Sequence, residues 1–178
     1  MRKFKKIKQL ITFIVSVCIL IGLDQYTKHI AEIKLKGHSP FVIIKGVFEL
    51  SYLRNTGAAW GILSGGRSIL ILFTCIVLII IAFIVYRTPV ERKYLPFKCV
   101  MVLLYAGAIG NLIDRIVNSY VIDFFYFRLI NFPVFNVSDI YVSVSMCLLI
   151  ILIFFVYKEE DFKFLSIKKA KKDMGIDG

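Results

Sequence analysis

Four apolar segments dominate this chain and limit the folds that are open to it. They lie at residues 10–23, 69–86, 99–113 and 140–157. A membrane-spanning helix needs about 20 residues, so the first and third segments must extend into flanking polar residues to cross a bilayer. With 58% hydrophobic residues and a mean hydropathy of +0.78, the chain is too apolar for one soluble core. The sequence predicts a membrane α-helical protein with four transmembrane helices.

Basic residues flank these segments unevenly and predict how the chain is oriented. Residues 2–8, 87–98 and 158–172 hold 15 of the 23 Lys and Arg residues. Because positive charge is retained on the cytoplasmic side, both termini are expected to be cytoplasmic. Residues 24–67, expected on the opposite side, carry six basic residues of their own. This segment is long enough to fold, so its charge has less influence on the orientation.

Two other functions of this basic charge are less consistent with the sequence. A basic run before an apolar segment resembles a cleavable signal peptide, but the segment ends in Gly22-Leu-Asp-Gln-Tyr-Thr-Lys28, without a small-x-small site. The net charge of +11 is distributed over helix ends and not over a soluble domain, so nucleic-acid binding is not expected. The charges are expected to set the topology and to attract anionic membrane lipid.

The segment after the first span has a different pattern. Residues 41–44 and 47–53 favour β-strands, and Lys45-Gly46 between them indicates a turn. We therefore expect a small extracytoplasmic β segment between spans one and two, with Trp60 at the membrane interface. Residues 1–157 are expected to form a single four-helix membrane domain, and residues 158–178 a solvated basic cytoplasmic tail.

Four aspartates lie at the outer ends of these predicted spans. Asp24 ends the first span, Asp114 ends the third, Asp123 lies in the following outer loop and Asp139 begins the fourth. An ionised carboxylate near hydrocarbon is costly, so such residues are candidates for a functional site. The topology alone predicts that all four converge at one face of the membrane.

The first and third spans offer structural alternatives for their acids. Asp24 and Lys28 are spaced for an ion pair within one exposed helix. Asp114 and Arg115 could anchor a helix at the headgroups, although adjacent helical residues do not face each other. Asn111 and Asp114 do share a helix face, which favours a site.

The remaining two acids have distinct local surroundings. Asn136 is placed to cap the fourth helix, with Asp139 at the third helical position, and such a cap would also fix the carboxylate. Asp123 lies within the aromatic and β-branched run 121–127, where desolvation should raise its pKa. Two carboxylates in a low-dielectric pocket share a proton, so one can activate water while the other acts as an acid toward a carbonyl.

Other chemistries have little support in the sequence. No Gly-x-Ser-x-Gly or His-Glu-x-x-His motif and no zinc-ligand spacing are present. An all-aspartate magnesium site would need phosphate or water partners that the sequence does not indicate, so no metal or cofactor is expected. An ion-coupled transporter would also carry buried acids, but transporters tend to show inverted repeats, and none is evident here. An assembly factor with structural ion pairs stays open, and it predicts that neutral substitutions of Asp123 and Asp139 are tolerated.

Five ordered blocks carry a resemblance to a known family. They are Asp24-Gln-Tyr-Thr-Lys28, Asn55-Thr-Gly-Ala-Ala-Trp60, Gly110-Asn-Leu-Ile-Asp-Arg115, Val121-Ile-Asp-Phe124 and Phe135-Asn-Val-Ser-Asp139. Over residues 10–157 the chain resembles the lipoprotein signal peptidases, also called signal peptidase II. Ser138 stands where that family more often has Ala.

The resemblance implies a membrane aspartic endopeptidase without a metal or cofactor. It implies a catalytic pair, Asp123 and Asp139. It also implies a set of substrate-binding or site-shaping residues: Asp24, Lys28, Asn55, Gly57, Asn111, Asp114, Arg115 and Asn136. The implied substrate is a prolipoprotein whose cysteine carries a diacylglyceryl group, cut before that cysteine at the outer face of the bacterial cell membrane.

Overall fold

The structure is a computed structural model that describes residues 2–57 and 66–166. Trp60, which was expected at the membrane interface, and residues 167–178 of the predicted tail lie outside the described residues.

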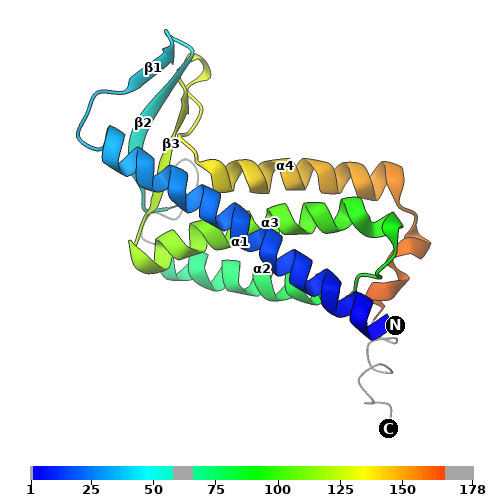
Figure 1. Ribbon diagram of the computed structural model, residues 1–178. Coiled ribbons are helices and arrows are strands. Elements are labelled where there is room, and N and C mark those ends of the chain that lie inside the picture. The colour runs from blue at the N-terminus through cyan, green and yellow to red at the C-terminus, as the bar shows by residue number, and fades with distance from the viewer. Residues whose placement is uncertain (1, 58–65, 167–178) are drawn as a thin grey trace.

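Four long helices form a bundle (Figure 1). They are α1 (Arg2–Leu35), α2 (Arg67–Arg87), α3 (Leu95–Val117) and α4 (Val137–Ile151), and α4 continues as one π-helical turn (Leu152–Val156). All four are long and apolar enough to cross a membrane, which confirms the predicted helices. As expected from the shortness of the first and third apolar segments, α1 extends through Asp24 and Lys28, and α3 extends through Asp114.

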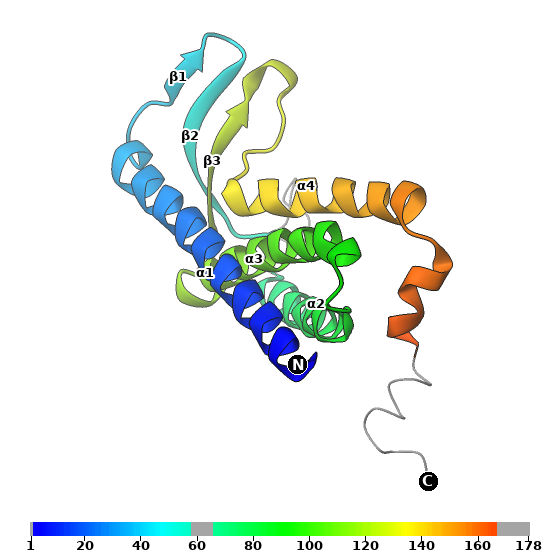
Figure 2. The same cartoon turned by 45° about the vertical axis from the view of Figure 1, so that its right-hand side comes forward.

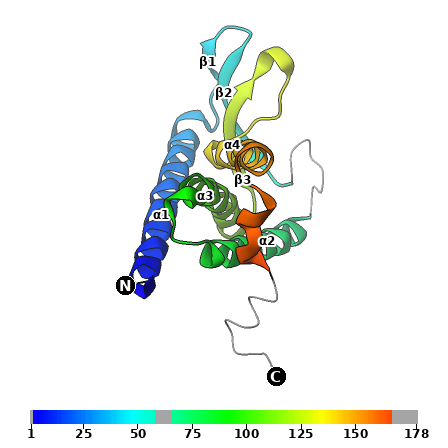
Figure 3. The ribbon, with the colours of Figure 1, turned by 90° about the vertical axis from the view of Figure 1, so that its right-hand side faces the viewer.

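Helix α3 lies in the middle of the bundle, between α1 on one side and α2 and α4 on the other (Figure 3). Two glycines of α3 allow this close packing. A Cβ atom at Gly107 would lie 2.6 Å from the Ser138 carbonyl oxygen, and one at Gly110 would lie 2.6 Å from Asp24 Oδ2. Small residues are a common means of bringing membrane helices together. Here they bring α1 and the first turn of α4 against the same part of α3.

A three-stranded antiparallel sheet projects from one end of the bundle (Figures 1 and 2). Its order is β1 (Phe41–Ile44), β2 (Phe48–Asn55) and β3 (Val121–Phe127). The first two strands and the turn between them confirm the prediction, and Gly46 adopts the positive φ of 75° that such a turn favours. The third strand, β3, was not predicted. The segment around Asp123 was expected to be an outer loop, and that expectation is wrong. The first four residues of β3 are all buried, so the alternation that identifies a half-buried strand is missing.

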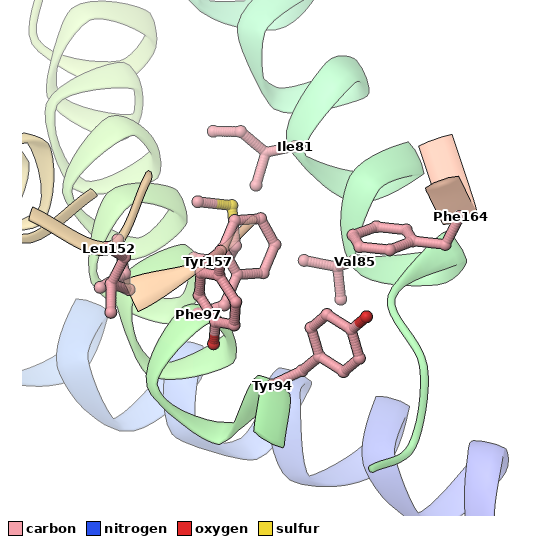
Figure 4. Close-up of a cluster of buried hydrophobic side chains, with 9 residues drawn as sticks. Ile81, Val85, Tyr94, Phe97, Leu152, Tyr157 and Phe164 are labelled. Carbon is pink, nitrogen blue, oxygen red and sulfur yellow. The ribbon is translucent and has the colours of Figure 1, made fainter. Parts of the chain in front are cut away.

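The opposite end of the bundle is closed by an aromatic cluster, which packs against aliphatic side chains of α2 and α3 (Figure 4). Its members are Tyr94, Phe97, Tyr157 and Phe164. Residues Glu159–Leu165 form the short helix η5, and Phe164 is buried against Tyr94 with its ring centroid at 5.5 Å. Arg87 Nε donates to the Phe164 carbonyl oxygen at 2.9 Å, and Lys93 forms an ion pair with Asp161. The expectation of a solvated tail from residue 158 onward is therefore wrong for this first part, whose aromatic residues provide the apolar surface that packs.

Candidate active site

Asp123 is held by two amide side chains from different elements. It lies on β3 and is 1% exposed. Its Oδ2 accepts a hydrogen bond from Asn55 Nδ2 at 2.8 Å, and its Oδ1 accepts one from Asn136 Nδ2 at 2.6 Å. Asn55 ends the neighbouring strand β2, and Asn136 precedes α4. The carboxylate is therefore fixed at the junction of the sheet and the bundle.

Asp139 lies in the first turn of α4 and is fixed by the cap of that helix. Asn136 Oδ1 accepts from the Asp139 backbone N–H at 3.1 Å, while Asp139 Oδ2 accepts from the Asn136 backbone N–H at 3.1 Å. This reciprocal pair is a capping box, which confirms the cap predicted from the sequence. Asp139 Oδ1 accepts a further hydrogen bond from Asn111 Nδ2 at 2.7 Å. Asn136 thus contacts both acids.

Both carboxylates line one pocket of about 180 Å³. A larger groove of about 400 Å³ adjoins it and runs between α2, α3 and α4. The groove is mostly apolar, and Asn111, Arg115 and Asp139 belong to the walls of both cavities. A polar pocket therefore lies at the end of an apolar groove that could hold an extended or helical segment.

The surroundings of Asp123 favour its protonated form. Burial, followed by the nearby charge of Asp139, raises the pKa of Asp123 to about 7. Hydrogen bonds from Asn55 and Asn136 and the charge of Lys28 oppose this rise, because each stabilises the ionised carboxylate. The raised pKa expected from the sequence is confirmed. Near neutral pH, the two acids can therefore hold one proton between them.

A buried ion network centred on Lys28 lies beside the two acids. Lys28 Nζ is 2.9 Å from Asp24 Oδ2, 2.9 Å from Asp114 Oδ2 and 3.0 Å from Asn111 Oδ1. The side chains of Lys28, Asp24 and Asp114 are at most 2% exposed. The predicted pair of Asp24 and Lys28 forms, but it is buried and shared instead of exposed. Within the described residues, Asp114 pairs with Lys28 and not with Arg115, so the alternative of a headgroup anchor is wrong.

This network also reaches the backbone next to each acid of the pair. Asp114 Oδ2 accepts from the Ile122 N–H at 3.3 Å, and Asp24 Oδ1 accepts from the Ser138 N–H at 2.8 Å. Ile122 directly precedes Asp123, and Ser138 directly precedes Asp139. Gln25, which sequence reasoning missed, donates to Asp24 and to Asp114 at 3.1 Å each. In the sequence, the only indication of this contact is that Gln25 directly follows Asp24. The three helices and β3 are thereby tied to one buried cation.

Arg115 and Gly57 complete the group of residues predicted from the sequence. The Arg115 guanidinium reaches the Gly57 carbonyl oxygen at 3.5 Å and the Asn111 carbonyl oxygen at 3.3 Å. The Gly57 N–H donates to Asn55 Oδ1 at 3.0 Å, which orients the Asn55 amide so that its nitrogen faces Asp123. The structure thus brings every predicted site residue into one connected network. In the described part of the chain, no group of three or more His, Cys, Asp or Glu side chains is arranged to hold a metal ion.

Four apolar helices, with a buried and a half-buried carboxylate lining one pocket at one end, define a multi-pass membrane protein with a polar site. Residues 16–155 match the family described as signal peptidase (SPase) II. The chain therefore belongs to the signal peptidase II family.

Individual relatives agree with this assignment. A lipoprotein signal peptidase of Streptococcus thermophilus (strain CNRZ 1066) is 37% identical over 147 residues, which cover 83% of this chain and 93% of that protein. One from Clostridium acetobutylicum is 41% identical over 150 residues, with 83% and 95% covered. A bacterial membrane enzyme solved by the in meso method superimposes with a TM-score of 0.72 at 32% identity, covering 82% of this chain and 94% of that one.

Proposed function

We propose that this protein is an aspartic endopeptidase that removes the signal peptide from diacylglyceryl-modified prolipoproteins, cutting before the lipidated cysteine. The observation that carries the proposal is a pair of carboxylates on one pocket, the buried Asp123 from β3 and the half-buried Asp139 from α4. Membership of the signal peptidase II family, whose relatives are named lipoprotein signal peptidases, supports the substrate class.

The mechanism follows from the proton held by the pair. Asp123, protonated near neutral pH, donates to the oxygen of the scissile carbonyl. Asp139, ionised, accepts a proton from a water molecule, whose oxygen attacks the carbonyl carbon to give a tetrahedral diol. On collapse of the diol, the proton on Asp139 passes to the leaving amine, the C–N bond breaks, and a hydroxyl proton returns to Asp123. Each acid ends in its starting state.

The neighbouring residues act as positioning groups in this mechanism. Asn55, Asn111 and Asn136 contribute amides, which hold the carboxylates by hydrogen bonds and carry no proton to transfer at working pH. The network around Lys28 holds β3 and the start of α4 in register with α1 and α3. A site of this kind depends on such supporting contacts, since small displacements of the reacting groups are costly.

The adjoining groove supports a substrate embedded in the membrane. Its apolar walls from α2, α3 and α4 suit the hydrophobic part of a signal peptide, and its polar end lies at Asp139. The exposed strand β1 is at the edge of the sheet and is suited to pair with an extended backbone. We infer that the protein resides in the bacterial cell membrane among its lipids, with both termini cytoplasmic and the site toward the outer face.

Cleavage of a defined precursor by the purified protein tests the proposal. In lipid nanodiscs, the wild-type chain should cut a diacylglyceryl-modified precursor and leave the unlipidated precursor intact. Asp123→Asn and Asp139→Asn should each lower kcat by about 10²- to 10⁴-fold, because each removes a proton-transferring group. Asp161→Asn is the matched control, since Asp161 pairs with Lys93 at the other end of the bundle and should leave kcat unchanged. Wild-type turnover by either site variant would refute the carboxylate mechanism and favour a structural role for these acids.

A further inference from the structure

A second groove lies at the end of the bundle away from the sheet and is not part of the site described above. It has a volume of about 330 Å³ and lies between the N-terminal parts of α1 and of α3, with Val85 and Val90 closing it on the α2 side. This volume is at the lower end of the range of roughly 300 to 1,000 Å³ typical of ligand pockets. Figure 1 shows that this end of the bundle holds the start of α1.

The groove is polar at one end and apolar along its length. On α1 the lining runs from Lys5 to Ser16, a distance of about 16 Å at 1.5 Å per helical residue. That distance is close to half of the roughly 30 Å hydrocarbon thickness of a bilayer, which is the depth of one leaflet. On α3 the lining runs in the same direction from Leu95 and Lys98 to Val102 deeper in the groove. The cavity therefore has the length and polarity of a single lipid molecule in one leaflet.

Three ammonium groups surround the polar end. Lys5 and Lys8 are exposed, Lys98 is half-buried, and all three line the groove. Among the described residues none of them forms an ion pair with a carboxylate, and the only hydrogen bond of Lys98 is a 3.5 Å contact to the Glu91 carbonyl oxygen. Lys6, by contrast, is used within the fold, because its Nζ donates to the Thr88 carbonyl oxygen at 2.7 Å. The charge of Glu91 acts on Lys98 from beyond ion-pair distance. Three cations that form no ion pair among the described residues favour an anionic group at this place.

One buried acceptor at the same end also lacks a donor. Gln9 Nε2 donates to the Thr88 carbonyl oxygen at 3.3 Å, which fixes the orientation of the amide. Gln9 Oε1 is buried without a hydrogen-bond partner in the described part of the chain. A buried acceptor left unsatisfied costs about 1 to 3 kcal/mol. This atom has almost no surface open to the groove, so it is a local cost within the fold and not a contact for a ligand.

We propose that this groove binds an anionic phospholipid, such as a phosphatidylglycerol, from the leaflet on the side of the start of α1. The phosphate lies among Lys5, Lys8 and Lys98, and one acyl chain follows the groove toward Ser16 and Val102. The proposal is independent of the peptidase reaction, because the groove shares no residue with the pocket of Asp123 and Asp139.

Native mass spectrometry of the full chain released from detergent tests this site. The wild-type protein should retain one phosphatidylglycerol with an affinity at least about tenfold above that for phosphatidylcholine of the same chain length. The attraction of each lysine to an anionic headgroup is comparable in size to the free energy that a tenfold change in affinity requires. The triple variant Lys5→Gln, Lys8→Gln, Lys98→Gln should lose this preference. Cys99→Phe should also lower the affinity at least about tenfold, because Cys99 is exposed and a larger side chain there enters the groove without displacing the core.

A matched control separates a site from general charge. Lys3→Gln, Lys158→Gln and Lys163→Gln remove three exposed charges from the same end of the molecule, outside the groove, and should keep the preference. The proposal is overturned by equal binding of the two lipids, by equal loss in both triple variants, or by wild-type binding in Cys99→Phe. It is also overturned if inorganic phosphate at equal concentration displaces the lipid, because the site would then bind a free anion. Peptide cleavage is not the readout, so failure here leaves the proposed enzymatic function untouched.

Discussion

Asn136 is the residue on which the geometry of both acids depends. Its side-chain nitrogen donates to Asp123 at 2.6 Å, and its oxygen and backbone N–H form the capping box with Asp139. The two acids come from different elements, so a shared partner fixes their relative position more tightly than two separate partners would. The pKa of Asp123 is raised mainly by burial and next by the charge of Asp139.

The pH dependence of cleavage should report this pKa. In the proposed mechanism Asp123 acts in its protonated form, so kcat/KM should fall as the pH rises through about 7. Asn55→Ala removes a hydrogen bond that stabilises the ionised form, so the pKa should rise and the alkaline limb should move to higher pH. The variant should also be slower, by roughly 10- to 150-fold, the equivalent of about 1.5 to 3 kcal/mol for a hydrogen bond to a charged group.

Profiles of kcat/KM against the lipidated precursor between pH 5 and 9 measure both effects. Asn118→Ala, at the exposed end of α3 and outside the pocket, is the matched amide control and should keep the wild-type profile. An alkaline limb that moves to lower pH in Asn55→Ala would contradict the assignment of Asp123 as the proton donor.

Single residues differ in how far the sequence reveals them. Asp123 and Asp139 could be identified as unusual because their neighbours in the chain are apolar or cap a helix, and both are local properties. The partner of Asp114 could not be identified in this way, since it depends on how α1 is rotated against α3. The sequence offered only the adjacent Arg115, whose spacing was unfavourable, whereas packing places Lys28 of another helix 2.9 Å from the carboxylate.

Among the elements, α3 carries the closest packing requirement. A Cβ atom at Gly110 would lie 2.6 Å from Asp24 Oδ2 and would also collide with Ser138 Oγ. Gly110→Ala should therefore push α1 and α4 away from α3. We expect a loss of about 1 to 3 kcal/mol in stability, typical of overpacking, together with reduced cleavage.

Gly22→Ala is the matched control for this change. Gly22 lies in α1 with no atom within 4 Å of its Cβ position. Alanine there should be neutral or should stabilise the protein by about 0.5 to 1 kcal/mol, because it favours the helix. Thermal unfolding of both variants in the same detergent gives the comparison. Unfolding of Gly110→Ala at the wild-type temperature would show that the helices do not need this contact.

The elements were predictable to different degrees for a physical reason. Long apolar runs identify membrane helices without knowledge of their neighbours, and all four were found. The pair β1 and β2 is local and has a turn between its strands. Strand β3 pairs with β2, but the two strands are separated in the sequence by α2 and α3. The buried residues of β3 show no alternation of apolar and polar positions. Nothing local therefore distinguishes it from an apolar loop.

At the scale of the whole molecule, the sheet and the aromatic cluster mark opposite ends of the bundle (Figure 1). The basic residues lie mainly at the end of the cluster, so that end should be cytoplasmic. In a variant whose four native cysteines are replaced by alanine, a single cysteine at Lys45 should react with a membrane-impermeant maleimide in intact cells. A single cysteine at Glu91 should react only after permeabilisation. Both positions are exposed, so access depends on the side of the membrane. Labelling of Glu91 in intact cells would invert the proposed orientation.

The buried network around Lys28 also has a consequence for the biosynthesis of this protein. The Ser138 N–H that binds the Asp24 carboxylate is synthesised 114 residues after Asp24. Until then, the first helix must enter the bilayer without α3 or α4, and an isolated charge within a spanning helix is unfavourable. Lys28 lies one turn from Asp24 on the same helix and is 2.9 Å from its carboxylate, so α1 carries its own counter-ion during insertion. The nascent chain can thus carry a neutralised part of the network in α1 alone. Asp123 and Asp139 come together only when the last helix arrives.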